Sequence, residues 1–504
     1  MPYFRLFIII SSILVTATYV TASTYVPLDD DGVYIYNTLD YLEAQGVLES
    51  GMLTTKPLSR AEIARLTLEA ERNAEGRSAL IQKLVRSLKE EFKDEISNTT
   101  FVKPVDSLYG EYTYSDLDNE AFNYSDNQSL NYNDEGVVYK KGSNLTAGLI
   151  SRGDLGWFSF YLDPEVRYSF KDSDTDVILH RGYGVLSFLG LDLTAGKDSQ
   201  WWGPGYNGAL LLSNNPEPLI FARLENPKPV VLPWIFKYLG PLRFTIFASH
   251  LDAERDVSNP ILWGARLEFK PLPYIQIGLE RTSMLGGEGR LEDLEIWWNS
   301  ITGRNEATHR PEDRATEPGD GKIGFDVKIT APFKFQPFQL YAEVVGEDEA
   351  GLLPTKRAYL AGIYLPRILS LERIGFRAEY AENHVSGEPN IWYTHHIYTS
   401  GYTYKKRIIG HHMGTDSNDL FFELSCLIPE RDGKIAISYD KQKHNLSGDV
   451  KEKEEGVSLK VNMRLIKGLQ LKAAYSYGKI KNIDNVPDEN MNLNLFTAWI
   501  RYIF

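Results

Sequence analysis

Apolar and polar side chains alternate along much of the chain after about residue 105. Over residues 457–465 the apolar side chains occupy the odd positions and the polar ones the even positions, and the pattern resumes after the tripeptide 466–468. A second pair of such segments, 263–269 and 275–279, is joined by residues 271–273. A period of two predicts strands that have one apolar and one polar face.

Segment lengths and loop lengths favour a membrane barrel over a half-buried sheet in water. The segments lie near the roughly 9–11 residues that cross a bilayer on a tilt. Short turns alternate with long polar connections, as expected when periplasmic turns are short and outer loops are long. The short turns are 466–468, 271–273, 333–337 and 428–433, and the long connections include 284–320 and 441–456.

The end of the chain points the same way. Counting back from the last residue, Phe504, Tyr502, Ile500, Ala498 and Phe496 share one face of the final segment. An aromatic residue at the very end resembles the terminal strand that the barrel-assembly machinery recognises, so Phe504 and Tyr502 are the expected assembly signal. We therefore predict an all-β transmembrane fold: a large antiparallel outer-membrane barrel over residues 105–504, surrounded by lipid.

The first hundred residues follow another pattern. Residues 1–23 read as a signal peptide, with a basic start, an apolar core over 6–20, and the small residues Ala22 and Ser23 at a cleavage site. Residues 24–104 then repeat apolar side chains at helical spacing, and Ser59 and Glu62 fit a capping box. We expect a small helical domain in the periplasm.

The rhythm of the loops also predicts an orientation. If Phe504 ends in the periplasm, the turns 466–468 and 428–433 face the periplasm too, whereas residues 198–227 lie on the outer side or fold into the lumen. The connections expected outside are 252–260, 284–320, 347–356, 405–418, 441–456 and 479–492.

Composition narrows the classes of function. The net charge of −14 disfavours a nucleic-acid partner. Cys426 is the only cysteine, so no disulfide can form within the chain. The sequence holds no phosphate-binding loop, dinucleotide fingerprint, serine-hydrolase elbow or zinc-protease motif. We expect no cofactor and no catalytic residues.

Four dense motifs lie on the segments predicted outside or in the lumen. They are residues 200–205 running into 210–216, residues 281–290, residues 340–351, and residues 393–402 closed by 409–412. In their order along the chain and in their residue sequences, these motifs resemble the capsule-assembly (Wzi-type) outer-membrane proteins over about residues 190–420. The resemblance implies an 18-stranded barrel, a helical bundle on the periplasmic side, and a lectin-like role that holds exported capsular polysaccharide. Residues 403–406 and 413–414 depart from the family pattern, so a divergent member could hold a different glycan, such as an exopolysaccharide or an O-antigen-like polymer.

Each motif offers candidate residues with an alternative reading. Trp201 and Trp202 could stack on sugar rings or shape a buried plug. Carboxyls at 347–349 could act as acid and base, although ion pairs with Lys356, Arg357 or Arg223 are the simpler expectation. Histidines 395, 396, 411 and 412 could bind a metal, but no patterned acid partner accompanies them, so ordinary hydrogen bonding is expected. The candidate polysaccharide-binding residues are Trp201, Trp202, Arg223, Glu347, Asp348, Glu349, His396 and Tyr402.

From the sequence we predict a non-enzymatic outer-membrane barrel that binds or anchors capsular or other surface polysaccharide. A porin with an open lumen is the main alternative, because large barrels leave an aqueous path. An outer-membrane hydrolase is a third possibility, for which no Ser-His-acid order stands out.

Overall fold

The computed structural model describes residues 22–28, 30–117, 130–303, 319–349 and 354–504. The predicted signal peptide therefore lies outside the described residues, apart from Ala22 and Ser23. Both of these are buried, and the amide of Ala22 donates a hydrogen bond to the carbonyl of Gly156 at 2.6 Å.

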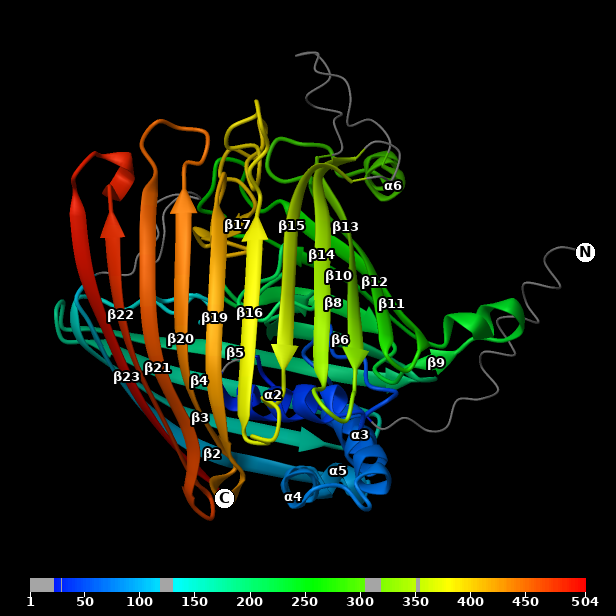
Figure 1. Cartoon of the computed structure of the whole chain (residues 1–504). Helices are drawn as coiled ribbons and strands as arrows, with labels where there is room; N and C mark the ends of the chain where they lie inside the picture. Colours follow the sequence, from blue (N-terminus) through cyan, green and yellow to red (C-terminus); the bar gives the residue numbers. More distant parts are fainter. Residues whose placement is uncertain (1–21, 29, 118–129, 304–318, 350–353) are drawn as a thin grey trace, which may run out of the picture.

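Nearly all of the strands belong to one closed antiparallel barrel (Figure 1). The barrel strands are β2 (Phe101–Ser115), β3 (Gly142–Asp154), β4 (Phe158–Ser169), β5 (Asp174–Phe188), β6 (Leu191–Asp198), β8 (Leu219–Glu225), β9 (Val230–Val231), β10 (Pro241–His250), β11 (Ile261–Leu272), β12 (Ile275–Leu285), β13 (Asp320–Ala331), β14 (Phe338–Glu349), β15 (Pro354–Leu365), β16 (Ile374–Glu382), β19 (Asn418–Ile428), β20 (Gly433–His444), β21 (Glu452–Ile466), β22 (Leu469–Lys481) and β23 (Asn490–Ile503).

Each wall strand pairs with the next along the chain, apart from β8 and β9, and β2 pairs with β23 to close the wall. Strands β8 and β9 both pair with β10 and share one position, so the described strands form an 18-stranded barrel. The predicted all-β fold is confirmed. The first strand begins at Phe101, slightly before the boundary expected at residue 105.

The alternation places apolar side chains outside and polar ones inside. On β21, Val457 and Leu459 are 43% and 48% exposed, and they lie opposite Tyr477 and Tyr475 of β22. Lumen-facing charges such as Arg266 are almost fully buried. This is the reverse of a water-soluble sheet, and it suits a wall whose outer face contacts lipid. None of the helices in the described part of the chain is long and apolar enough to cross a membrane.

The helical module comprises α2 (Asp30–Ala44), α3 (Arg60–Asn73), α4 (Ala79–Glu91) and α5 (Lys93–Ile96). Ser59 caps α3 as predicted, because its hydroxyl accepts a hydrogen bond from the amide of Glu62 at 3.1 Å. The Glu62 carboxylate binds Arg65 one turn on, at 2.7 Å. Helix α4 buries Leu80, Leu84 and Leu88 on one face, as its spacing predicts.

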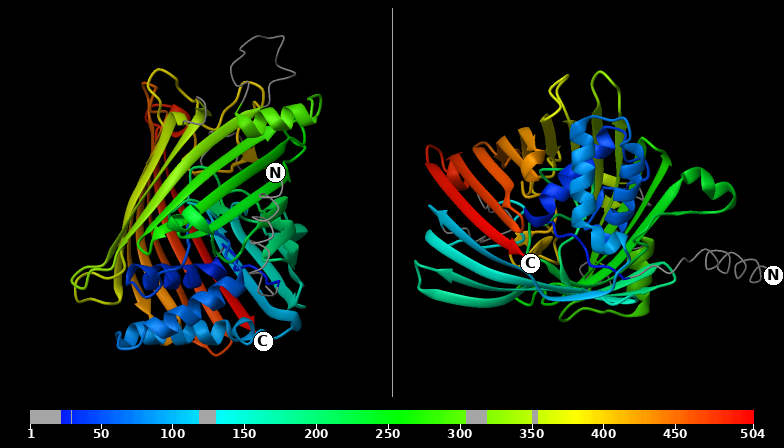
Figure 2. Two further views of the ribbon diagram at one scale, coloured as in Figure 1. Left: turned by 90° about the vertical axis from the view of Figure 1, so that its right-hand side faces the viewer. Right: turned by 90° about the horizontal axis from the view of Figure 1, so that it is seen from below.

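The module lies against the end of the barrel that carries the short turns and the C-terminus, whereas the long connections cluster at the other end (Figures 1 and 2). Those connections hold α6 (Leu294–Thr302) and the short helix η4 (Ile483–Asn485). The distribution agrees with the predicted rhythm of short and long loops. We refer to the end with the helical module as the periplasmic end and to the opposite end as the outer end.

Candidate functional site

Two segments fold into the lumen from the outer end and pack against its wall. We call residues 199–218 and 383–417 the plug. Its apolar side chains form one buried cluster with inward-facing residues of the wall, including Phe247 of β10, Leu262 of β11 and Val345 of β14. The buried plug residues of this cluster are Trp202, Leu210, Leu211, Leu212, Trp392, Tyr393, Tyr398, Tyr402, Tyr404, Ile408, Ile409 and Met413. Residues 198–227 were expected outside or in the lumen, and their first half lies in the lumen.

The plug meets the helical module inside the barrel. Strand β1 (Thr55–Lys56), from the loop before α3, pairs antiparallel with β7 (Trp201–Trp202) of the plug. The amide of Gly203 also donates to the carbonyl of Thr54 at 2.9 Å. Gly203 has φ of 115°, and a Cβ there would lie 2.5 Å from Oε2 of Glu343, so a larger residue would disrupt this junction.

Both tryptophans predicted from the sequence are buried at that junction. Trp202 is fully buried, and its ring meets Phe247 edge-on with 5.4 Å between centroids. Trp201 lies beneath the ammonium group of Lys56 at 5.8 Å, and burial lowers the pKa of Lys56 to about 8. Both tryptophans therefore lie inside the plug, as the second of the two interpretations given for them describes. A sugar ring would reach either indole only after the plug had moved.

The remaining candidates also contribute to the packing of the lumen. Arg223 is buried on β8, 4.3 Å above the ring of Tyr25 and 3.5 Å from Glu225. Glu347 forms an ion pair, but its partner is Lys322 of β13 at 2.9 Å and not Lys356, Arg357 or Arg223. The reason is the register of β13 and β14, which pairs Ile323 with Gly346 and so places Lys322 beside Glu347. The side chains of Asp348 and Glu349 lie outside the described residues.

Tyr402 is buried and donates to the hydroxyl of Thr282 at 3.0 Å, while the ammonium group of Lys322 lies 4.6 Å over its ring. His396 is exposed on the plug, and its ring lies against His395 with 4.4 Å between centroids. The four histidines therefore form two separate pairs, because His411 and His412 are buried together deeper in the lumen.

A groove that the sequence did not reveal opens at the outer ends of β3 to β6. Its volume is about 530 Å³, and the tip of the plug forms one wall. Glu217 lies between two ammonium groups there, 3.3 Å from Lys197 and 2.7 Å from Lys405. The charged residues that line the groove are the cationic Lys140, Arg167, Lys197, Lys405, Lys406 and Arg407 and the acidic Asp172, Asp174, Asp176 and Glu217. These residues come from separate strands and loops, so no local sequence motif could have predicted that they line one groove. Lys405 and Lys406 had stood out only as a departure from the family pattern.

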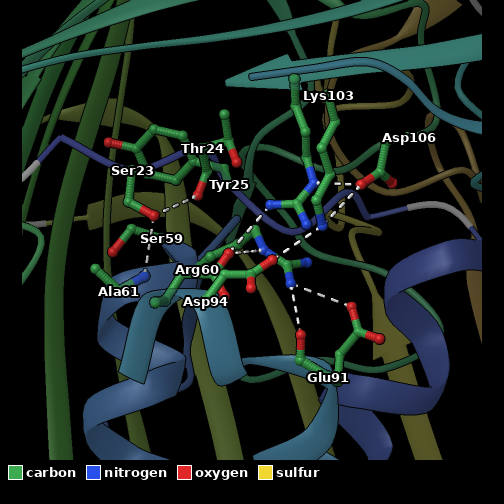
Figure 3. Close-up of polar contacts among 12 residues, drawn as sticks. Ser23, Thr24, Tyr25, Ser59, Arg60, Ala61, Glu91, Asp94, Lys103 and Asp106 are labelled. Atoms are coloured by element: carbon green, nitrogen blue, oxygen red, sulfur yellow. Dashed lines mark hydrogen bonds and ion pairs between the residues drawn. The ribbon is translucent and has the colours of Figure 1, made fainter. Parts of the chain in front are cut away.

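An ion-pair network holds the module to the periplasmic end of the wall (Figure 3). Arg60 of α3 pairs with Glu95 and, at 3.2 Å, with Glu91. Arg152 of β3 reaches Glu95 at 3.1 Å and Asp106 of β2 at 3.0 Å. Burial alone would raise the pKa of the Glu95 carboxyl, but the charges of Arg60 and Arg152 hold it at about 2. The module, the wall and the plug are thereby fastened to one another.

Comparison with known proteins agrees with this architecture. A family model described as capsule assembly protein Wzi matches residues 121–495. An uncharacterized 55.8 kDa protein in the cps region of Klebsiella pneumoniae is 27% identical over 335 residues, which make up 65% of this chain and 59% of that protein. The match thus spans less than two thirds of the curated relative's length.

Solved structures give the fold. One is described as Wzi of Escherichia coli, an outer membrane protein involved in group 1 capsule assembly and a carbohydrate-binding β-barrel. It superposes with a TM-score of 0.75 at 21% identity, over 96% of this chain and 100% of that chain. Pseudomonas aeruginosa OpdQ superposes with a TM-score of only 0.46 at 11% identity, over 79% of this chain and 96% of that chain.

Proposed function

Because the chain belongs to the Wzi family of capsule assembly proteins, we propose that this outer-membrane barrel holds exported surface polysaccharide at the cell surface without modifying it. The related Escherichia coli barrel is described as carbohydrate-binding, which supports the same class of ligand here.

The groove at the outer end, lined by six cationic and four acidic side chains, is the observation that carries the proposal. It is open beside the tip of the plug, and ammonium and guanidinium groups line it in a protein whose net charge is −14. Such groups bind the hydroxyl and carboxylate oxygens of a polysaccharide through charge-assisted hydrogen bonds. Among the residues predicted from the sequence, Trp201, Trp202 and Tyr402 would act by keeping the plug in place, and exposed His396 remains a candidate contact.

The plug in the lumen supports holding over conduction. An open porin needs a continuous aqueous path, whereas aromatic and aliphatic plug residues occupy this lumen and pack against its wall. The carboxylate of Glu347 is engaged by Lys322, which favours a structural role over that of a hydrolytic acid or base.

The experiment compares polymer attachment in cells that carry or lack the gene. An anchor acts after export, so its deletion should move polymer from the cell pellet to the medium and leave the total nearly unchanged. Attached polymer after deletion would contradict anchoring. Altered solute uptake with attached polymer would indicate a porin, and a changed chain length would indicate a hydrolase.

A charge-reversal pair tests the groove itself. The double variant Lys405→Glu with Lys406→Glu should shed polymer although the barrel assembles normally, because it replaces two cations of the groove by anions. The double variant Lys451→Glu with Lys453→Glu, at the outer end but away from the groove, is the control because it changes the net charge by the same amount. Equal retention in the groove variant and the control would exclude the groove as the binding site.

A further inference from the structure

Two histidines of the plug face an aspartate of the wall. Nε2 of His412 lies 3.3 Å from Oδ2 of Asp419, at the start of β19, and Nε2 of His411 lies 3.9 Å from the same oxygen. One donor atom from each residue lies within 4.8 Å of the others, and all three side chains are buried. The sequence offered no acid partner for these histidines, because the partner lies beyond the plug on the wall.

Three atoms of this cluster lack the hydrogen-bond partners that buried polar atoms normally have. Neither ring nitrogen of His412 makes a hydrogen bond within the described part of the chain, and neither does Oδ1 of Asp419. A buried imidazole without a partner loses its hydrogen bonds to water and gains nothing in return, which is unfavourable. His412 and Asp419 therefore each retain a buried atom without a hydrogen-bond partner in the described part of the chain, while Oδ2 of Asp419, which faces both histidines, accepts from Asn207.

A second carboxyl adjoins the first. Asp440 of β20 hydrogen-bonds Asp419, and the amide of Asn207 donates to both, at 2.7 Å and 2.9 Å. Among the described ion pairs, Asp419 has only the two imidazoles as partners and Asp440 has none. Two buried carboxylates in contact repel each other unless a proton or a cation lies between them.

The separations suit a metal ion. In a tetrahedral site with bonds of about 2.0–2.1 Å, neighbouring donor atoms are about 3.4 Å apart. The observed 3.3 Å and 3.9 Å come close to this value without any change in the backbone. We propose that His412, Asp419 and His411 bind a divalent transition-metal ion of the Zn²⁺ class, with the neighbouring Asp440 carboxyl adding negative charge beside Asp419. Mixed imidazole and carboxylate ligands favour such ions over Ca²⁺ or Mg²⁺.

The two histidines differ in how easily their Nε2 atoms can coordinate a metal ion. Nδ1 of His411 accepts a hydrogen bond from the amide of Met413 at 3.2 Å, so its proton lies on Nε2. Coordination through Nε2 moves that proton to Nδ1 and breaks the contact with Met413. Nothing comparable restrains His412, whose ring is stacked under Tyr132 with 4.4 Å between centroids. His412 and Asp419 are therefore the principal ligands.

The position of the site defines its role. The histidines belong to the plug, whereas Asp419 and Asp440 belong to adjacent wall strands. A cation bound to both fastens the plug to the wall, and its binding free energy stabilises the closed plug. Its place between the plug and the wall, with all three ligands buried, suits a structural ion rather than one that meets a substrate.

Metal content measures the site directly. The full-length protein in detergent is stripped with EDTA, dialysed against ZnCl₂ and then against buffer, and assayed by mass spectrometry for zinc. We expect about one Zn²⁺ per wild-type chain, and loss of that ion in His412→Ala and Asp419→Asn. His396→Ala, which removes an exposed histidine of the same plug, should retain it. Zinc content equal in wild type and both site variants overturns the site, as does its absence from the wild type.

Two further measurements keep the outcome clear. The shift in gel migration between unboiled and boiled samples reports whether each variant has a folded barrel, and His412→Gln replaces His412→Ala if the latter fails to assemble. Trypsin cleavage at Lys405 and Lys406 reports on the plug. Zn²⁺ should slow this cleavage in the wild type and leave the rate unchanged in Asp419→Asn. Binding of Zn²⁺ without slower cleavage would overturn the fastening role.

Discussion

Replacing Trp202 by alanine should loosen the plug while leaving the barrel wall intact. Trp202 is fully buried, packs on Phe247, and donates through its backbone amide to the carbonyl of Leu212 at 3.0 Å. Its strand, β7, pairs with β1 and belongs to none of the wall ladders. The substitution therefore removes contacts between plug, wall and module without breaking a wall hydrogen bond.

The expected magnitude follows from the size of the buried ring. Truncating a buried tryptophan to alanine costs about 3–5 kcal/mol, which combines the lost transfer free energy and the cavity left behind. If that loss falls on docking of the plug, the equilibrium between displaced and seated plug shifts by roughly two to three and a half orders of magnitude, at about 1.4 kcal/mol per tenfold change. A closed barrel should become a conducting one.

Conductance in planar bilayers is the direct assay. The wild type should pass little ion current, and Trp202→Ala should show frequent openings of a large pore. Trp298→Ala is the matched control, since Trp298 lies 58% exposed on α6 at the outer end and contributes nothing to the plug. Migration of unboiled samples confirms that both variants are folded. A folded Trp202→Ala barrel that conducts no more than the control would refute this view of the plug.

Three further predictions concern assembly, orientation and the module. Deleting Phe504, or replacing it by a charged residue, should lower the amount of assembled barrel in the outer membrane, and unchanged surface levels would show the aromatic ending to be incidental. A tag within 441–456 should be accessible on intact cells, whereas a tag at Lys467 should need a permeabilised outer membrane; the opposite pattern would invert the barrel. Glu95→Gln should weaken the network that holds the module, since breaking a buried ion pair costs about 3–5 kcal/mol, and limited proteolysis should cleave the module faster. The folded-state pKa of Glu95 is about 2, below its usual 4.5. The stability that its charge gives the docked module is therefore present above pH 4.5 and is lost as the pH falls through about 2. Protease susceptibility of the module that does not change over this pH range would contradict the role of the ion pair.

The wall was predictable because each of its strands faces two different environments. Lipid on one side and a polar lumen on the other impose a period of two on the side chains. This period can be recognised in residues 457–465 without knowing which strands lie beside them. The same physics makes the terminal strand recognisable, with Phe496, Ile500 and Tyr502 on its exposed face.

The plug was not predictable in this way. Residues 200–216 and 393–412 have no regular period, and their burial depends on walls that come from distant parts of the chain. The partner of Glu347 required the register between two strands, and the partner of His412 required the position of Asp419 on the wall. Sequence motifs identified the plug segments but could not show that their aromatic residues point into the protein.

The pairing of β1 with β7 makes the two ends of the molecule thermodynamically linked. A ligand at the outer end that shifts the plug must also shift the free energy with which the helical module docks at the opposite end, because Trp201 and Trp202 of the plug pair with β1 of the module. Linkage is reciprocal: a periplasmic factor that displaces the module changes affinity at the surface by the same factor with which the surface ligand changes affinity for it. If a ligand binds at the outer end, its binding is therefore coupled to the docking of the helical module at the opposite end of the barrel.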